Sequence, residues 1–209
     1  MTPTASPAPR TLLFIGDSIT DCGRREDPEG LGHGYVRLLA EHFAAHEPTA
    51  TVINRGISGD RVADLEARFG ADCLDLSPDA VTIYVGVNDS WHRFTRGEQI
   101  TEDSFAQGYR HLLAQLAAAL PEAPVVLIIP FVADIDDQVA RIHSDLDGKV
   151  AIIRSLAQEH GHRTVDLEQV LATALAAGHA PQSIAEDGVH PTPAGHRLIA
   201  DAWLDAVGR

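Results

Sequence analysis

The stretch FIGDSIT, residues 14–20, closes a short apolar run with a glycine, a carboxylate and two hydroxyl side chains. The run starts at Leu12 and ends at Gly16, which is typical of an interior parallel strand rather than of an amphipathic helix. Open α/β sheets bind their ligands just beyond the carboxyl ends of such strands. Ser18 therefore stands where three roles are open: nucleophile, phosphate ligand or helix N-cap.

Short apolar runs alternate with longer helical patterns through the rest of the chain. The predicted strands cover residues 11–16, 50–54, 80–86, 124–130 and 163–166. The predicted helices cover residues 33–46, 60–69, 102–119, 137–160, 167–177 and 193–207. This alternation predicts one doubly wound α/β domain with five parallel strands and helices on both faces of the sheet. We expect this domain to span residues 10–209 and residues 1–9 to form a flexible N-terminal tail.

The composition argues against several classes of protein. With 44% hydrophobic and 22% charged residues the chain is expected to be globular, and its formal net charge of −14 argues against nucleic acid or a membrane as partner. The first ten residues lack the basic and apolar regions of a signal peptide, and no apolar stretch approaches the roughly 18 residues of a membrane span. Cys22 and Cys73 do not make a disulfide framework, so we expect a cytoplasmic protein.

Small and polar residues follow three of the predicted strands. Ser18 comes after the first strand, Gly59 lies in ISGD after the second, and Asn88 lies in GVND after the third. Because parallel strands end at the same edge of a sheet, these residues should converge. Near the C-terminus, DGVH places Asp187 and His190 three residues apart on a turn. A serine, a histidine, an acid and hydrogen-bond donors are the groups that acyl transfer requires.

Each of these signals also has a purely structural interpretation. Ser18 fits a helix N-cap, and the glycine-rich loop after the second strand fits phosphate binding but lacks the usual phosphate-loop endings. Asn88 and its neighbour fit a turn, and the Asp187 turn could simply precede a helix that starts at Thr192 and Pro193. The pair His160 and His162 fits a helix end better than a metal site. We prefer the catalytic interpretation because four separate signals fall at the expected tips of one architecture.

The four blocks around Ser18, Gly59, Asn88 and the Asp187–His190 turn resemble those of the SGNH hydrolases, also called the GDSL family. The stretches LLFIGDSITDCGRR, LGHGYV, NRGISGDRVADLEARF and GVNDSW are similar to those of intracellular acetylxylan esterases, within its carbohydrate acetylesterase branch. The resemblance implies a flavodoxin-like three-layer α/β/α sandwich and removal of acetyl groups from sugars, with xylo-oligosaccharides as the expected substrates. It also implies assembly into a homo-oligomer. Ile19 stands where the name motif has leucine, which is an apolar exchange.

The chemistry of these residues suggests a mechanism. A serine hydroxyl is a weak nucleophile at neutral pH, so Ser18 needs His190 to accept its proton, and Asp187 would orient the imidazole. The backbone N–H groups of Ser18 and Gly59 and the side-chain amide of Asn88 would form the oxyanion hole. This scheme needs no metal or cofactor.

The substrate pocket is less well defined by the sequence. Trp91 could stack on a sugar or close a small acyl pocket, although core packing is its structural alternative. Asp17, Tyr35 and Arg61 are further candidates for the pocket, and the segment 131–148, taken as a loop, matches no motif. The expected partner is a small acetylated sugar or ester.

Three other functions share some of these features. A general short-chain esterase, or a lysophospholipase- or thioesterase-type acylhydrolase, would use the same catalytic residues with a different acyl pocket. A carbohydrate-binding module would need no nucleophile, and a flavodoxin-like binder of nucleotide or flavin rests on the fold alone.

Overall fold

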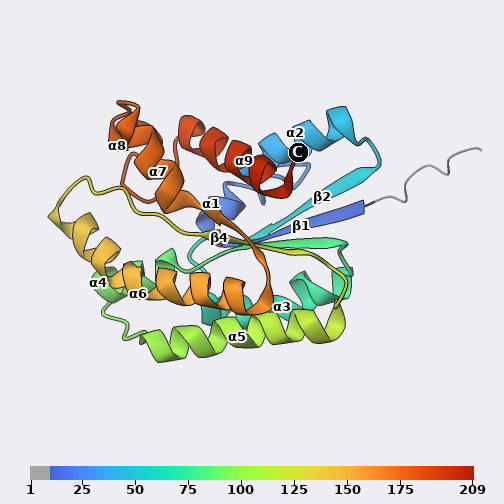
Figure 1. Cartoon of the computed structure of the whole chain (residues 1–209), viewed down its shortest axis with the longest axis horizontal. Coiled ribbons are helices and arrows are strands. Elements are labelled where there is room, and N and C mark those ends of the chain that lie inside the picture. The colour runs from blue at the N-terminus through green and yellow to red at the C-terminus, as the bar shows by residue number, and fades with distance from the viewer. Residues whose placement is uncertain (1–9) are drawn as a thin grey trace, which may run out of the picture.

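A computed structural model describes residues 10–209, and the expected tail, residues 1–9, lies outside the described residues. Five strands form one parallel sheet in the order β2-β1-β3-β4-β5 (Figure 1). The strands are β1 (Arg10–Gly16), β2 (Ala50–Gly56), β3 (Ala80–Tyr84), β4 (Val125–Ile129) and β5 (Arg163–Asp166). This strand order is that of the flavodoxin-like doubly wound sheet, so the predicted α/β fold class is confirmed.

Helices cover both faces of the sheet. The helices are α1 (Ser18–Asp21), α2 (Tyr35–His46), α3 (Val62–Asp72), α4 (Val87–Arg96), α5 (Glu102–Ala119), α6 (Asp137–His160), α7 (Leu167–Ala176), α8 (Pro181–Ile184) and α9 (Pro193–Val207), with a short 3₁₀ turn, η1, at Leu74–Leu76. One core cluster joins the sheet to α3, α5 and α6, and a second joins its other face to α2, α7 and α9. Figure 1 shows these two helical layers below and above the strands.

The apolar run at the start of the chain explains why the sheet needs two layers. Leu13 and Ile15 of β1 belong to the α3–α5–α6 cluster, whereas Leu12 and Phe14 belong to the α2–α7–α9 cluster. Successive side chains of a strand point to opposite faces, so a continuous apolar run requires cover on both sides. The pairing of β1 with β2 and β3 then places Gly16 beside Gly56 and Tyr84 at one edge of the sheet.

Two segments differ from the sequence prediction. The chain after β3 was expected to continue as a strand to residue 86 and then turn, but α4 starts at Val87 and buries mainly polar side chains. The sequence analysis assigned residues 137–148 both to the helix 137–160 and to the loop 131–148; the structure confirms the helix, and only residues 131–136 lie outside it. Asp136 caps α6, because its Oδ1 accepts hydrogen bonds from the backbone N–H groups of Gln138 and Val139, both at 2.9 Å.

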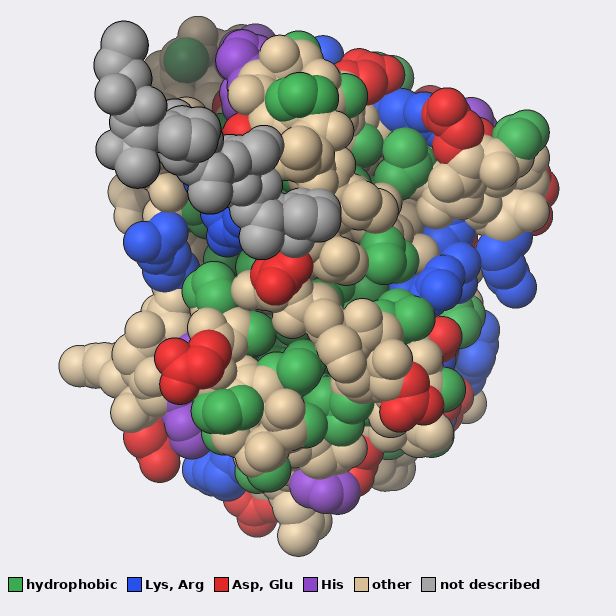
Figure 2. Space-filling view, turned by 90° about the vertical axis from the view of Figure 1, so that its right-hand side faces the viewer, with side chains coloured by type: hydrophobic (Ala, Val, Ile, Leu, Met, Phe, Trp, Pro, Cys, Tyr) green, Lys and Arg blue, Asp and Glu red, His purple; other side chains and the backbone are tan. Residues whose placement is uncertain are grey.

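Three further features bear on the expectations from composition: the mixture of side chains on the surface, the membrane-spanning potential of the helices and the state of the two cysteines. Figure 2 shows the end of the molecule where the chain enters β1, with acidic, basic and hydrophobic side chains interspersed. No helix in the described part of the chain is long and apolar enough to cross a membrane. Cys22 and Cys73 are both free thiols.

Candidate active site

Ser18 is placed by the end of β1 and the first turn of α1. The N-cap of that helix is Asp17, whose Oδ1 accepts a hydrogen bond from the backbone N–H of Ile19 at 3.0 Å. Ser18 is the first helical residue, so its hydroxyl is not used as a cap. This leaves the side chain partly exposed at the carboxyl edge of the sheet.

The structure brings Ser18, His190 and Asp187 together. The Ser18 hydroxyl lies 3.0 Å from Nε2 of His190, and Nδ1 of His190 lies 2.7 Å from Oδ2 of Asp187. Partial burial alone would raise the pKa of Asp187, but its hydrogen bonds with His190 and Val189 outweigh burial and hold the pKa below its usual value. An ionised Asp187 favours the imidazole tautomer that donates from Nδ1 and leaves Nε2 free to accept the serine proton.

A closed turn holds Asp187 and His190 in this geometry. An antiparallel bridge between Ala185 and Pro191 closes it, and Oδ1 of Asp187 accepts the backbone N–H of His190 at 2.7 Å. Gly188 adopts φ +82°, and a Cβ there would lie 2.6 Å from the carbonyl oxygen of Ala133. The N–H of Ala133 donates to the Gly188 carbonyl at 2.8 Å, so the segment after β4 supports the turn.

The three groups expected to form the oxyanion hole each have an N–H that the described residues leave free. Gly59 has φ +89°, a conformation that favours glycine, and open space surrounds the position that a Cβ would occupy. The backbone N–H groups of Ser18 and Gly59 donate to no residue in the described chain. The amide of Asn88 donates one hydrogen to the carbonyl of Asp60 at 3.0 Å, which leaves its second hydrogen available.

Asp89 connects the two segments that carry these donors. Its side chain is 2% exposed, and its Oδ2 accepts the backbone N–H of Val62 at 3.1 Å. Burial raises the pKa of Asp89 to about 7, against the opposing effect of the Val62 hydrogen bond. The sequence analysis considered the neighbour of Asn88 only as a possible turn residue. The signal that could have identified the role of Asp89 was the position of an acid directly after Asn88, in a segment that begins with a buried strand.

Lys149 of α6 also supports α4, and the sequence analysis missed it. Its side chain is 1% exposed, and its Nζ donates to Oγ of Ser90 at 3.0 Å and to Oδ2 of Asp145 at 2.6 Å. A lysine in a long helix is usually exposed, so the sequence offered no signal for this burial.

Trp91 lies between the core and the candidate site. Its ring is 6.5 Å from the His190 ring, centroid to centroid, with the planes at 73°. The partly buried indole also packs against the α3–α5–α6 core cluster. Trp91 therefore packs against the core and also lies next to His190, the candidate catalytic base.

The other pocket candidates are placed differently. Asp17 and Tyr35 are both fully buried, and the Tyr35 hydroxyl bonds the Thr20 hydroxyl at 2.9 Å, so neither side chain reaches the surface of the site. This corrects their assignment to the pocket; a sequence pattern cannot show that the polar groups of Asp17 and Tyr35 point inward. Arg61 is partly exposed and pairs with Asp64 and Glu98.

One cluster in the described chain has the residue types of a metal site. Ligand atoms of His143, Asp147 and Glu168 lie within 4.8 Å of one another. The hydrogen bond with Glu168, together with one to Asp134, raises the pKa of His143 to about 9. His143 is therefore a cation at neutral pH, which makes the cluster an ion-pair network rather than a ready metal site.

Comparisons with known proteins give a consistent result. The model of the GDSL-like lipase/acylhydrolase family matches residues 14–198. An acetylxylan esterase of Geobacillus stearothermophilus is 34% identical over 208 residues, which cover 94% of this chain and 93% of that protein.

Solved structures extend the similarity to three dimensions. A GDSL-like lipase from Parabacteroides merdae has a TM-score of 0.89 at 32% identity, over 96% of both chains. The Geobacillus acetylxylan esterase has a TM-score of 0.85 at 31% identity, over 99% of this chain and 97% of its own. Catalytic mutants of that esterase replace a serine, an aspartate and a histidine by alanine, and the latter two stand three positions apart.

Proposed function

The chain belongs to the GDSL-like lipase/acylhydrolase family and is a carboxylic ester hydrolase, and from this premise we propose that it removes acetyl groups from acetylated carbohydrates, with xylo-oligosaccharides as substrates. The observation that carries the proposal is the hydrogen-bonded series Ser18–His190–Asp187. The spacing of Asp187 and His190 equals that of the catalytic aspartate and histidine of the Geobacillus esterase, which supports the same roles here.

The first half of the proposed reaction forms an acetyl-enzyme. The Ser18 Oγ attacks the acetyl carbonyl carbon while His190 Nε2 takes the hydroxyl proton. The negative charge that develops on the carbonyl oxygen is stabilised by the N–H groups of Ser18, Gly59 and Asn88. The C–O bond to the sugar then breaks, and the imidazolium returns its proton to the departing sugar oxygen.

The second half releases acetate. A water molecule takes the place of the sugar, loses a proton to His190 and attacks the carbonyl carbon of acetyl-Ser18. The same N–H donors stabilise the second tetrahedral intermediate. Breaking the bond to Ser18 Oγ, with return of the proton to that oxygen, restores the free enzyme.

The preference for acetyl rests on Trp91 and on the relatives. An indole beside His190 would limit the length of acyl chain that fits against Ser18. In one of its solved structures, that of a mutant, the Geobacillus relative is named an acetyl-xylooligosaccharide esterase. The lipid or thioester acylhydrolase would use the same catalytic residues but requires a longer apolar channel.

Hydrolysis of a series of p-nitrophenyl esters tests this proposal. We expect kcat/KM to fall steeply from acetyl to butyryl and to be nearly absent for octanoyl, because each methylene that finds no room forfeits about 0.8 kcal/mol of burial and a clash adds to that loss. Trp91→Ala should move the profile towards longer chains and weaken acetyl turnover.

Ser18→Ala is the control for the nucleophile and should lose several orders of magnitude in kcat without loss of folding. Acetate release from acetylated xylo-oligosaccharides tests the sugar directly. A wild-type preference for octanoyl esters would replace the acetylesterase proposal by the lipid acylhydrolase.

A further inference from the structure

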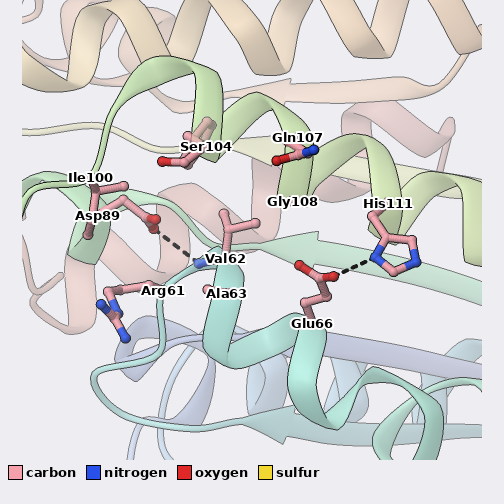
Figure 3. Close-up of a pocket in the computed structure, with 11 residues that line it drawn as sticks. Arg61, Val62, Ala63, Glu66, Asp89, Ile100, Ser104, Gln107, Gly108 and His111 are labelled. Carbon is pink, nitrogen blue, oxygen red and sulfur yellow. Dashed lines mark hydrogen bonds and ion pairs between the residues drawn. The ribbon is translucent and has the colours of Figure 1, made fainter.

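A cavity of about 520 Å³ lies between α3 and α5 (Figure 3). We call it the α3–α5 cavity. Arg61, Asp89 and Ile100 line one end of it, and the hydrogen-bonded pair of Glu66 and His111 lies at the other. Its volume falls within the range of small-molecule binding sites, which is roughly 300–1,000 Å³.

Two residues that line the cavity follow proposed oxyanion donors closely in the chain. Arg61 follows Gly59 by two residues, and Asp89 directly follows Asn88. The hydrogen bond from Asn88 to the carbonyl of Asp60 joins these two segments at the start of the cavity. A ligand held against Ser18 and extended past Arg61 would therefore enter the α3–α5 cavity.

Asp89 offers an unused acceptor at this end. Its Oδ2 accepts the Val62 N–H, but no described residue donates to its Oδ1. The residue is 2% exposed, yet Oδ1 is not among the polar atoms that are sealed inside the protein without a partner. Asp89 lines the cavity, and its Oδ1 is an acceptor that no donor in the described chain occupies.

The wall of the cavity fits a neutral polyhydroxyl ligand. Arg61 is already paired with Asp64 and Glu98, so it offers little to a phosphate or carboxylate. Between its two ends the wall combines uncharged polar side chains with apolar ones, namely Ser104 and Gln107 with Val62, Ile100 and Phe105. Sugars present hydroxyl groups at their edges and C–H groups on their faces, whereas an acyl chain requires a continuous apolar wall.

We propose that the α3–α5 cavity binds the xylose residues that neighbour the acetylated residue, so that it selects oligosaccharides over simple acetyl esters. The inference rests on the proposed function, because it names the part of the chain that holds the leaving group. Asp89 would accept a sugar hydroxyl, and the apolar side chains would pack against sugar C–H groups.

Unacetylated xylotetraose is the probe, titrated calorimetrically into the intact protein. Ala63→Trp on α3 and Gln107→Trp on α5 each place an indole in the cavity, and each should raise the Kd for xylotetraose at least tenfold. Ala71→Trp is the matched control, since it adds the same exposed side chain to α3 outside the cavity and should leave the Kd unchanged.

A Kd that stays the same in both cavity variants, or wild-type protein that does not bind xylotetraose at millimolar concentration, would overturn the inference. The ratio of kcat/KM for acetylated xylotetraose to that for p-nitrophenyl acetate should also fall at least tenfold in the cavity variants; an unchanged ratio counts against the cavity. If the wild-type enzyme releases no acetate from acetylated xylo-oligosaccharides, the proposed function fails, and this outcome is read separately from the titration.

Discussion

Asn88, which we propose as an oxyanion donor, uses only one of its two amide hydrogens within the described part of the chain. One of its hydrogens donates to the Asp60 carbonyl and fixes the orientation of the amide, while the other remains available to a developing oxyanion. A group fixed before the substrate arrives needs no reorganisation during the reaction. The internal hydrogen bond is therefore part of how the donor functions.

Asn88→Ala should lower kcat roughly 10²–10³-fold, because loss of one oxyanion donor has an effect of that size. KM should change little, since the donor acts on charge that appears in the transition state. Steady-state kinetics with p-nitrophenyl acetate measure both constants. A variant with a defect only in KM would assign Asn88 to substrate binding.

Asp187→Asn should lower the rate at neutral pH by roughly 10²–10⁴-fold, because an amide at this place favours the wrong imidazole tautomer. The backbone hydrogen bonds to Oδ1 can persist in the variant, so the turn should keep its shape. Glu186→Gln removes the neighbouring exposed acid and is the control. Equal activity of Asp187→Asn and wild type would leave a Ser18–His190 dyad.

The candidate catalytic residues could be predicted from sequence because each lies at a strand end or on a turn whose place follows from chain order. The positions of Asp17 and Tyr35 could not be predicted in the same way. Asp17 comes directly before Ser18, yet it turns inward to cap α1. The direction of one side chain depends on packing from remote elements, which no local pattern records.

Among the elements, α4 connects the candidate active site to the helices that pack around it. It carries Asn88 and Trp91, and it is attached to α3 through Asp89 and to α6 through Lys149. The sequence analysis missed this helix, although Val87, Trp91 and Phe94 recur at helical spacing along it. The polar residues between them, Asn88, Asp89 and Ser90, fit a turn as well as a helix, and in the structure two of them are held by hydrogen bonds to other elements.

Lys149→Ala should destabilise the protein by about 3 kcal/mol, because the partly buried Asp145 and the buried Ser90 lose a charged partner. For a chain of this size that corresponds to a fall in Tm of roughly 6–12 °C, measured by thermal unfolding. The remaining pair of Asp145 with Arg93 limits the loss.

Arg154→Ala on the same helix is the matched comparison. Its side chain is 43% exposed and pairs with Asp166 and Glu168, so solvent screening should keep the loss below about 1 kcal/mol. Similar losses in the two variants would mean that Lys149 does not anchor α4.

For the molecule as a whole, stability should depend on buried acids under the active site. Burial raises the pKa of Asp17 to about 7 from its ordinary value of 3.8, and its Oδ2 is sealed without a partner in the described chain. In the unfolded chain Asp17 ionises near pH 4, whereas in the folded chain it ionises only near pH 7. The contribution of this group is therefore most favourable at low pH and is lost as pH rises from about 4 to 7.

Asp17→Asn should accordingly raise Tm at pH 8.5 by several degrees and change it little at pH 4.5, since the amide keeps an acceptor for the Ile19 N–H without a charge. Thermal unfolding of both proteins at the two pH values measures the difference. Glu159→Gln, which removes an exposed acid, is the control. A Tm gain of the same size at both pH values would contradict a role for ionisation.

For the whole molecule, the sequence predicted the number and type of the main elements better than the order of the strands in the sheet. The alternation of apolar runs and helical patterns specifies five parallel strands with helices between them, and the bounds of α5, α6 and α9 agree with the prediction. The order β2-β1-β3-β4-β5 does not follow from that alternation, because strands buried on both faces have similar patterns. Only the resemblance to a known family indicated the order.

The two halves of the candidate site lie 172 residues apart in the chain, Ser18 near one end and His190 near the other. Synthesis proceeds from the N-terminus at about 5–20 residues per second, so the ribosome makes the nucleophile roughly 9–34 s before its base. A nascent or truncated chain that lacks the Ala185–Pro191 turn thus has a serine but no means to activate it. Ester hydrolysis by this protein should therefore begin only after synthesis has reached its last helix. Two separately expressed fragments should recover activity only when they assemble.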